Sequence, residues 1–208
     1  MRKLTALLCT AAMTLGMAAS AFANPSVSTV APESVSVSAA SAALLPEGTT
    51  LVVQAANPAN YANAQVAEAV TMLNDATQTV TMSQMLEILQ VDLTQEITTA
   101  GGMVIDPTAY EPITQFVDLA ISDGAEVAYD VDGNVLSVEA TITLEAVIGA
   151  NAEDLMLMQM DPTTGEVYFI EIDAENFNAQ TGEITVTFPC MGPFTVLETG
   201  AANTAAAE

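Results

Sequence analysis

The feature of this sequence that most constrains its fold is an almost complete absence of basic side chains. The 208 residues include 26 Asp and Glu, no His and only two basic residues, Arg2 and Lys3. Beyond residue 3 no side-chain salt bridge can form, because every charged side chain there is a carboxylate. A stable fold must therefore depend on the burial of apolar side chains and on hydrogen bonds.

The same absence excludes several classes of function. Without Lys, Arg or His there is no phosphate clamp, no Schiff-base lysine, no imidazole base and no imidazole metal ligand. Nucleic-acid binding relies on Lys and Arg, which release counterions from the phosphates, and an anionic membrane surface would repel the chain. We therefore expect no nucleic acid as a partner, no Ser-His-Asp chemistry and no enzymatic activity of a common type.

The N-terminus has the three parts of a secretory signal peptide. Arg2 and Lys3 precede an apolar run over 4–19, and Ala21-Phe22-Ala23 follows as a small-residue cleavage site. We expect residues 1–23 to be removed after Ala23, which would change the formal net charge from −24 to −26 and leave the protein secreted and extracellular. No later segment has the run of about 18 apolar residues that a membrane span needs.

One cysteine, Cys190, remains after this cleavage, so no intramolecular disulfide is expected. A nucleophilic thiol needs a cationic or imidazole neighbour, and the chain beyond residue 3 has neither. We interpret Cys190 as a small apolar residue within a strand pair.

Composition divides the rest of the chain into three parts. Residues 24–48 are rich in Ser, Ala, Val and Pro, and although their Ser-Val alternation would suit a strand, their low complexity predicts a flexible linker. Residues 49–199 suit one globular domain with a sizeable core. Residues 200–208 are small and polar, which predicts a disordered tail.

The first half of the domain, 49–124, is predicted to be mixed, with one or two short helices. Apolar residues at helical spacing predict a helix near 60–75, and a capping-box pattern from Thr81 to Gln84 predicts a second, shorter one. The apolar residues of the two helices are Val66, Ala69, Val70 and Leu73, then Met82, Met85, Leu86 and Leu89. Extended structure is expected at 50–54 and over 110–122.

The second half, 125–199, is predicted to consist of β hairpins. Each turn signal separates two strand-like runs: 126–131 and 134–145 around Asp132-Gly133, 155–160 and 166–172 around 161–165, and 183–188 and 194–198 around 189–193. Short strands at this spacing indicate an antiparallel β-sandwich. The fold class predicted for the whole chain is mainly β, or α+β overall.

Two kinds of acidic site deserve consideration. Asp130, Asp132 and Asn134 resemble the start of a calcium-binding loop, but Val135 and Thr141 stand where that loop needs Gly and Glu. A hairpin turn explains the same residues, so calcium is a weak candidate and no other cofactor is expected. An acid-only glycoside hydrolase would need two carboxylates across a cleft with aromatic walls, and the chain has no Trp and 5% aromatic residues.

The stretch from 154 to 198 resembles the C-terminal β module of uncharacterised secreted and cell-surface proteins of Gram-positive (Firmicutes-type) bacteria. The resemblance rests on a D-P-x-T-G turn, a T-G-x-I turn and a G-P-F corner, formed here by Asp161, Pro162, Thr164 and Gly165, by Thr181, Gly182 and Ile184, and by Gly192, Pro193 and Phe194. It implies a role at the cell envelope and carries over no catalytic residues.

Taken together, these features predict a secreted, acidic, non-enzymatic domain with a binding or structural role at the bacterial cell exterior. Its expected partner is an extracellular protein or glycan. A calcium-responsive surface protein is the first alternative, and an acid-only glycoside hydrolase is the second.

Overall fold

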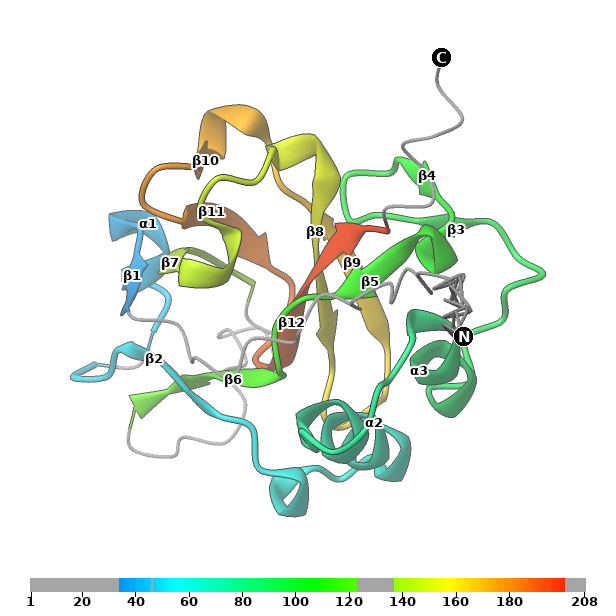
Figure 1. Ribbon diagram of the computed structural model, residues 1–208. Helices are drawn as coiled ribbons and strands as arrows, with labels where there is room; N and C mark the ends of the chain where they lie inside the picture. The colour runs from blue at the N-terminus through cyan, green and yellow to red at the C-terminus, as the bar shows by residue number, and fades with distance from the viewer. Residues whose placement is uncertain (1–33, 46, 123–136, 201–208) are drawn as a thin grey trace, which may run out of the picture.

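The computed structural model describes residues 34–45, 47–122 and 137–200, which form a mainly β fold of the α+β class, as the sequence predicted (Figure 1). One sheet, the four-stranded sheet, has the order β1-β7-β11-β10. The other, the six-stranded sheet, has the order β2-β6-β12-β8-β9, with β5 also paired to β12. Every strand pair in the two sheets is antiparallel.

The strands of the four-stranded sheet are β1 Ser34–Val37, β7 Val138–Thr143, β11 Glu183–Phe188 and β10 Phe177–Asn178. Those of the six-stranded sheet are β2 Leu51–Ala55, β6 Val117–Ile121, β12 Gly192–Thr199, β8 Leu155–Met160, β9 Val167–Glu171 and β5 Tyr110–Pro112. A small separate pair is formed by β3 Ile97–Thr98 and β4 Val104–Ile105.

The helices are α1 Ala39–Ala42, α2 Ala64–Asn74 and α3 Met82–Ile88. Short 3-10 turns connect other elements: η1 Pro58–Asn60, η2 Pro107–Ala109, η4 Glu145–Val147, η5 Ala152–Asp154 and η6 Ala174–Asn176. The described part of the chain contains no helix that is long and apolar enough to cross a membrane.

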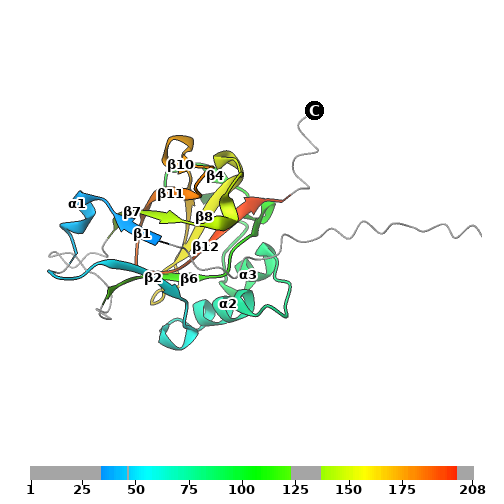
Figure 2. The ribbon, with the colours of Figure 1, turned by 60° about the vertical axis from the view of Figure 1, so that its left-hand side comes forward.

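The six-stranded sheet is buried on both faces, and this explains the nearly continuous apolar sequence of β8. Leu155 and Leu157 face the core between the two sheets, whereas Met156, Met158 and Met160 face a second core beneath α2 and α3. All six residues of β8 are buried. The molecule therefore has three layers, with α2 and α3 on the side of the six-stranded sheet away from β7 and β11 (Figure 2).

Both helices predicted in the first half are present, and the predicted capping box begins the second of them. The Asn63 side chain caps α2 by accepting hydrogen bonds from the backbone of Gln65 and Val66, at 3.0 and 3.1 Å. At α3, Thr81 and Gln84 form the reciprocal capping box, in which each side chain accepts from the other residue's backbone N–H. The apolar face of each helix packs against the six-stranded sheet.

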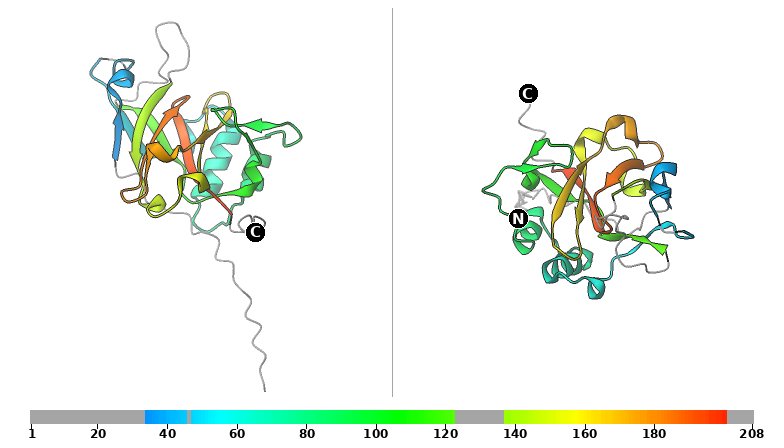
Figure 3. Two further views of the ribbon diagram at one scale, coloured as in Figure 1. Left: turned by 90° about the horizontal axis from the view of Figure 1, so that it is seen from above. Right: turned by 180° about the vertical axis from the view of Figure 1, so that it is seen from behind.

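The flexible-linker prediction for 24–48 is wrong over its described part. Ser34–Val37 is strand β1 and pairs with β7 over four residues (Figure 3). Its Ser-Val alternation places Val35 and Val37 against the inter-sheet core and exposes Ser34 and Ser36. The gain from covering the core outweighs the low complexity of the segment, so the folded region begins before residue 49.

The third predicted hairpin is also wrong. β11 pairs with β7 and β10, and β12 pairs with β5, β6 and β8, so these two strands belong to different sheets. The chain crosses between the sheets over residues 189–191, and Cys190 lies in this crossover rather than in a strand pair. Phe188 and Phe194 consequently meet across the core, with ring centroids 5.2 Å apart.

Several predictions concern residues outside the described ranges. These are the signal peptide, the linker before Ser34, the Asp132-Gly133 turn and the tail from residue 201. The hairpin of β8 and β9, in contrast, is described and is confirmed.

Candidate functional site

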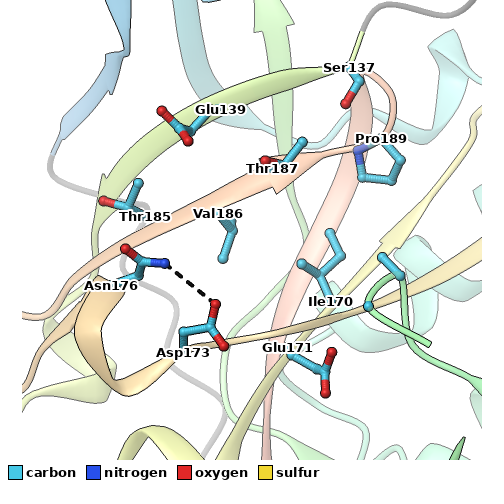
Figure 4. Close-up of a pocket in the computed structure, with 12 residues that line it drawn as sticks. Ser137, Glu139, Ile170, Glu171, Asp173, Asn176, Thr185, Val186, Thr187 and Pro189 are labelled. Carbon is cyan, nitrogen blue, oxygen red and sulfur yellow. Dashed lines mark hydrogen bonds between the residues drawn. The ribbon is translucent and has the colours of Figure 1, made fainter. Parts of the chain in front are cut away.

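A hollow of about 400 Å³ opens between β9 and β11, and we call it the carboxylate hollow (Figure 4). Val186 and Ile170 lie near its middle, and the carboxylates of Glu139, Glu171 and Asp173 lie around them. The remaining lining is Ala100, Gly101, Ser137, Asn176, Thr185, Thr187 and Pro189.

Strand alternation places these side chains. In β7, Val138 and Ala140 face the inter-sheet core, so Glu139 between them faces outward. In β11, Val186 faces the core while Thr185 and Thr187 face outward beside Glu139. Glu171 lies on a different strand, as the last residue of β9.

The turn between β3 and β4 closes one side of this hollow. The backbone N–H of Ala100 donates to the carbonyl of Phe169 at 2.7 Å, which ties the turn to β9. The Glu171 carboxylate lies so close to Gly101 that a side chain there would collide with it. Because this carboxylate is the far end of a flexible side chain, a small movement of Glu171 would relieve the contact, so the close approach does not by itself require Gly101.

The carboxylate hollow holds negative charge with little compensation. The Asn176 amide donates to Asp173 at 3.5 Å, whereas the described residues provide no hydrogen-bond donor to the carboxylates of Glu139 or Glu171. Within the described ranges, no three acidic or sulfur side chains converge closely enough to hold a metal ion. The arrangement therefore spreads its charge around a hollow instead of focusing it on one point.

A second hollow, of about 380 Å³, lies at β6 and is called the Asp118 hollow. Val117 and Leu119 face the inter-sheet core, so Asp118 between them projects toward η1. Its Oδ1 accepts a hydrogen bond from the Tyr61 hydroxyl at 2.7 Å. Asp118 is only 6% exposed, although it lines this hollow.

Burial shifts the titration of both groups. Desolvation raises the pKa of Asp118 above its usual value, and hydrogen bonds from Tyr61 and from the Asn57 backbone partly oppose this. Desolvation, followed by the nearby Asp118 charge, strongly raises the pKa of the Tyr61 phenol. Tyr61 is therefore a neutral donor at any physiological pH.

Cys190 is 1% exposed and lies near Asp161 and Glu166. Burial, followed by the charges of these two acids, raises the pKa of the thiol to about 12. The Gln159 amide donates to the Cys190 carbonyl at 2.7 Å, and its Oε1 has no partner among the described residues. The thiol is thus protonated at neutral pH, which is the opposite of what a nucleophile requires.

The sequence predicts no residue of either hollow as a candidate site residue. The candidate calcium residues Asp130, Asp132 and Asn134 lie outside the described ranges, so the calcium site stays a prediction. Sequence reasoning missed Asp118, although its signal was present as a single acid within the apolar strand V-D-L-A-I.

The two hollows differ in what they offer a sugar. The carboxylate hollow has three acids and no aromatic side chain in its lining. The Asp118 hollow has one acid and the ring of Tyr61. Neither combines the paired carboxylates and aromatic wall expected of a glycoside hydrolase.

Fold and sites together define an acidic, antiparallel two-sheet domain whose larger sheet is covered by two helices. No protein-family model, curated protein sequence or solved structure matches the chain. Its function is inferred below from the two hollows and from the charge of the chain.

Proposed function

We propose that the protein is an exported, non-enzymatic binding domain at the exterior of a Gram-positive bacterial cell, and that its carboxylate hollow binds positively charged groups of an extracellular protein or glycan. The observation that carries the proposal is the set of Glu139, Glu171 and Asp173 around one hollow. The chain beyond residue 3 supplies no cation to neutralise them.

Electrostatics favours a partner with several spaced positive charges. The three carboxylates come from β7, from β9 and from the segment after β9, and they do not converge on a metal-sized point. A polymer that carries amines at intervals matches such spacing better than a single ion. The net charge of the rest of the chain would also attract this partner from a distance and speed its association.

The absence of an equipped catalytic group supports a non-enzymatic role. The buried Cys190 thiol has a raised pKa, and the chain has no His. The surface location is supported by the N-terminal signal-peptide pattern and by turn motifs that resemble those of Gram-positive surface modules.

The purified full chain is to be tested on an array of peptidoglycan fragments, chitosan oligomers, neutral glycans and Lys-rich peptides. We expect it to retain amine-bearing probes and to release them as NaCl is raised, because salt screens exposed charges. The triple variant E139Q/E171Q/D173N should bind these probes at least about tenfold more weakly, because it loses charge-assisted contacts. A tenfold loss of affinity corresponds to about 1.4 kcal/mol of binding free energy.

The matched control is E68Q/E87Q/E96Q, which changes the net charge by the same amount at three exposed positions. It should retain most of the binding. Equal losses of affinity in the two triple variants would mean that binding depends on net charge alone. That result would refute a role for the carboxylate hollow. Turnover of any array substrate at an enzymatic rate would refute the non-enzymatic role.

A further inference from the structure

We propose that the Asp118 hollow is a second binding site, one that takes a primary ammonium group on a short alkyl stem. It shares no lining residue with the carboxylate hollow, so either proposal can fail without the other. The carrying observation is a nearly buried carboxylate that lines an open hollow in a chain with no basic side chain beyond Lys3.

The Asp118 carboxylate keeps capacity for a ligand. A carboxylate has about four acceptor positions; the Tyr61 hydroxyl uses one on Oδ1, at 2.7 Å, and the Asn57 backbone uses a second. Tyr61 also fixes the orientation of the carboxylate, so a ligand meets a positioned acceptor. Gln54 and Asn60 line the same hollow and provide further oxygen acceptors for the other N–H bonds of an ammonium group.

The rest of the lining suits an alkyl stem. Leu119, Ile121, Pro162 and Met191 contribute apolar surface beside Asp118. A ligand that is cationic at one end and apolar at the other would satisfy both parts of the hollow.

Other ligand classes fit less well. An anion would be repelled by Asp118. A calcium site usually combines six to eight oxygen ligands that include several carboxylates, and Asp118 is the one carboxylate among the described lining residues. A neutral apolar ligand would displace water from the carboxylate without replacing its hydrogen bonds, which is costly.

Ionisation of the Asp118 carboxyl group is unfavourable without a counter-charge nearby. Burial raises the pKa of this carboxyl, which shows that the surroundings disfavour its ionised form. A bound ammonium group would supply the missing counter-charge. The same group would form a charge-assisted hydrogen bond, which is among the stronger polar contacts.

Met191 lines the Asp118 hollow, so the NMR signal of its methyl group can report binding there. The full chain, labelled with ¹³C at Met methyl groups, is titrated with n-butylammonium chloride and followed by NMR. We expect the Met191 signal to shift saturably. n-Butanol and tetramethylammonium chloride at matched ionic strength should produce no saturable shift, since the first lacks charge and the second lacks N–H donors.

The source of the ammonium group is distinguished by peptides. N-acetyl-Ala-Lys-Ala-amide should shift the same signal if the site accepts a lysine side chain, and the norleucine analogue should not. Binding of both amines indicates a site for a lysine side chain of a partner. Binding of n-butylammonium alone indicates a site for free amines, and either result supports the shared chemistry.

Substitutions at Asp118 and Thr163, each with a control variant, test the site. D118N should weaken n-butylammonium binding by roughly tenfold or more, because the charge-assisted contact is lost. E87Q removes one exposed carboxylate from α3 and should bind like the wild type. T163K places a tethered ammonium group at the exposed rim of the hollow. It should block n-butylammonium, whereas T163Q should not.

The T163K comparison keeps the test decisive if D118N fails to fold, because Thr163 is exposed. Equal affinity in D118N and wild type, or equal binding of n-butanol and n-butylammonium, would overturn the proposal. So would unchanged n-butylammonium binding in T163K.

Discussion

The contact between Phe188 and Phe194 permits a quantitative test of the sandwich. Phe188 projects from β11 of the four-stranded sheet and Phe194 from β12 of the six-stranded sheet. The rings are 0% and 1% exposed, their centroids are 5.2 Å apart and their planes are inclined by 59°. This tilted geometry is one that aromatic pairs prefer.

The magnitude follows from burial and from the ring contact. Truncation of a fully buried Phe leaves a cavity that little can fill, so F188A should lower the free energy of unfolding by about 3–5 kcal/mol. That loss corresponds to a decrease in Tm of roughly 6–20 °C for a domain of this size. The ring–ring interaction itself should contribute roughly 0.5–1.5 kcal/mol to the stability, which a double-mutant cycle can isolate.

Urea unfolding followed by far-UV circular dichroism is a suitable assay. F188A gives the cavity cost, and the milder variants F188L, F194L and their combination give the coupling energy while keeping the chain folded. V104A, at a side chain that is 56% exposed, serves as the control and should change stability by less than about 0.5 kcal/mol. A cost for F188A near that of V104A, or strictly additive Leu variants, would refute the packing of these rings between the sheets.

Three further predictions address a cap, the first strand and a buried acid. T81A should lower the free energy of unfolding by about 1 kcal/mol, because α3 loses its capping hydrogen bond, while S83A on the exposed face of the same helix should not; urea titration of both checks this. V37D should cost about 1–3 kcal/mol, because it places a carboxylate against the inter-sheet core, and S36D should change stability little; equal effects in urea would restore the linker interpretation. For Asp118, burial raises the folded-state pKa above the usual value of an aspartate, so at intermediate pH the folded chain retains a proton that the unfolded chain has released. Stability from this group is therefore present below the unfolded pKa and lost as pH rises through the folded pKa. The stability of D118N relative to wild type should increase from pH 4 to pH 7 in urea titrations at both values, and a constant difference would contradict the assigned direction.

Local signals in the sequence were sufficient for several elements. The turn between β8 and β9 is determined by its own residues, since Asp161 Oδ1 accepts from the backbone of Thr163 and Thr164 at 2.7 and 3.0 Å. Gly165 then adopts a φ of +81°, which favours glycine. The α3 cap is equally local. Elements whose partners lie within a few residues could therefore be predicted from the pattern alone.

Long-range pairing could not be predicted in this way. β1 pairs with β7, and Ser34 lies opposite Thr143, 109 residues later. The low complexity around β1 indicated a linker, because no neighbouring residue in the sequence shows that this segment pairs with the edge of β7. The crossover at 189–191 was missed for the same reason, since a Pro- and Gly-rich segment suits a hairpin and a sheet change alike.

The candidate sites follow the same division. Strand alternation is sufficient to predict that Glu139 faces outward. It cannot show that Glu171 and Asp173 lie near it, because the meeting of β7, β9 and β11 is a tertiary property. The Asp118 hollow likewise depends on Tyr61 and Thr163, which come from distant parts of the chain.

Several Asp carboxylates in the described part of the chain accept hydrogen bonds from a Thr two residues later, in the same kind of local turn. In three Asp-x-Thr turns the Asp Oδ1 accepts from the Thr hydroxyl at 2.6 Å and from the Thr backbone at 2.9–3.0 Å: Asp75 with Thr77, Asp92 with Thr94, and Asp106 with Thr108. These hydrogen bonds, the Thr hydroxyl first, lower the pKa of Asp75 and Asp92.

Such turns satisfy the acceptors but do not cancel the charge. At Asp75 and Asp92 these hydrogen bonds favour the ionised form of the carboxyl group, and no ion pair among the described residues neutralises the negative charge of these two side chains. The chain therefore combines a well-ordered surface with a field that attracts cations, and salt should weaken that attraction because exposed charges are screened within about 10 Å at 0.1 M. An ordered surface with a negative electrostatic field suits the binding of cationic partners. The field would add no affinity for a neutral partner.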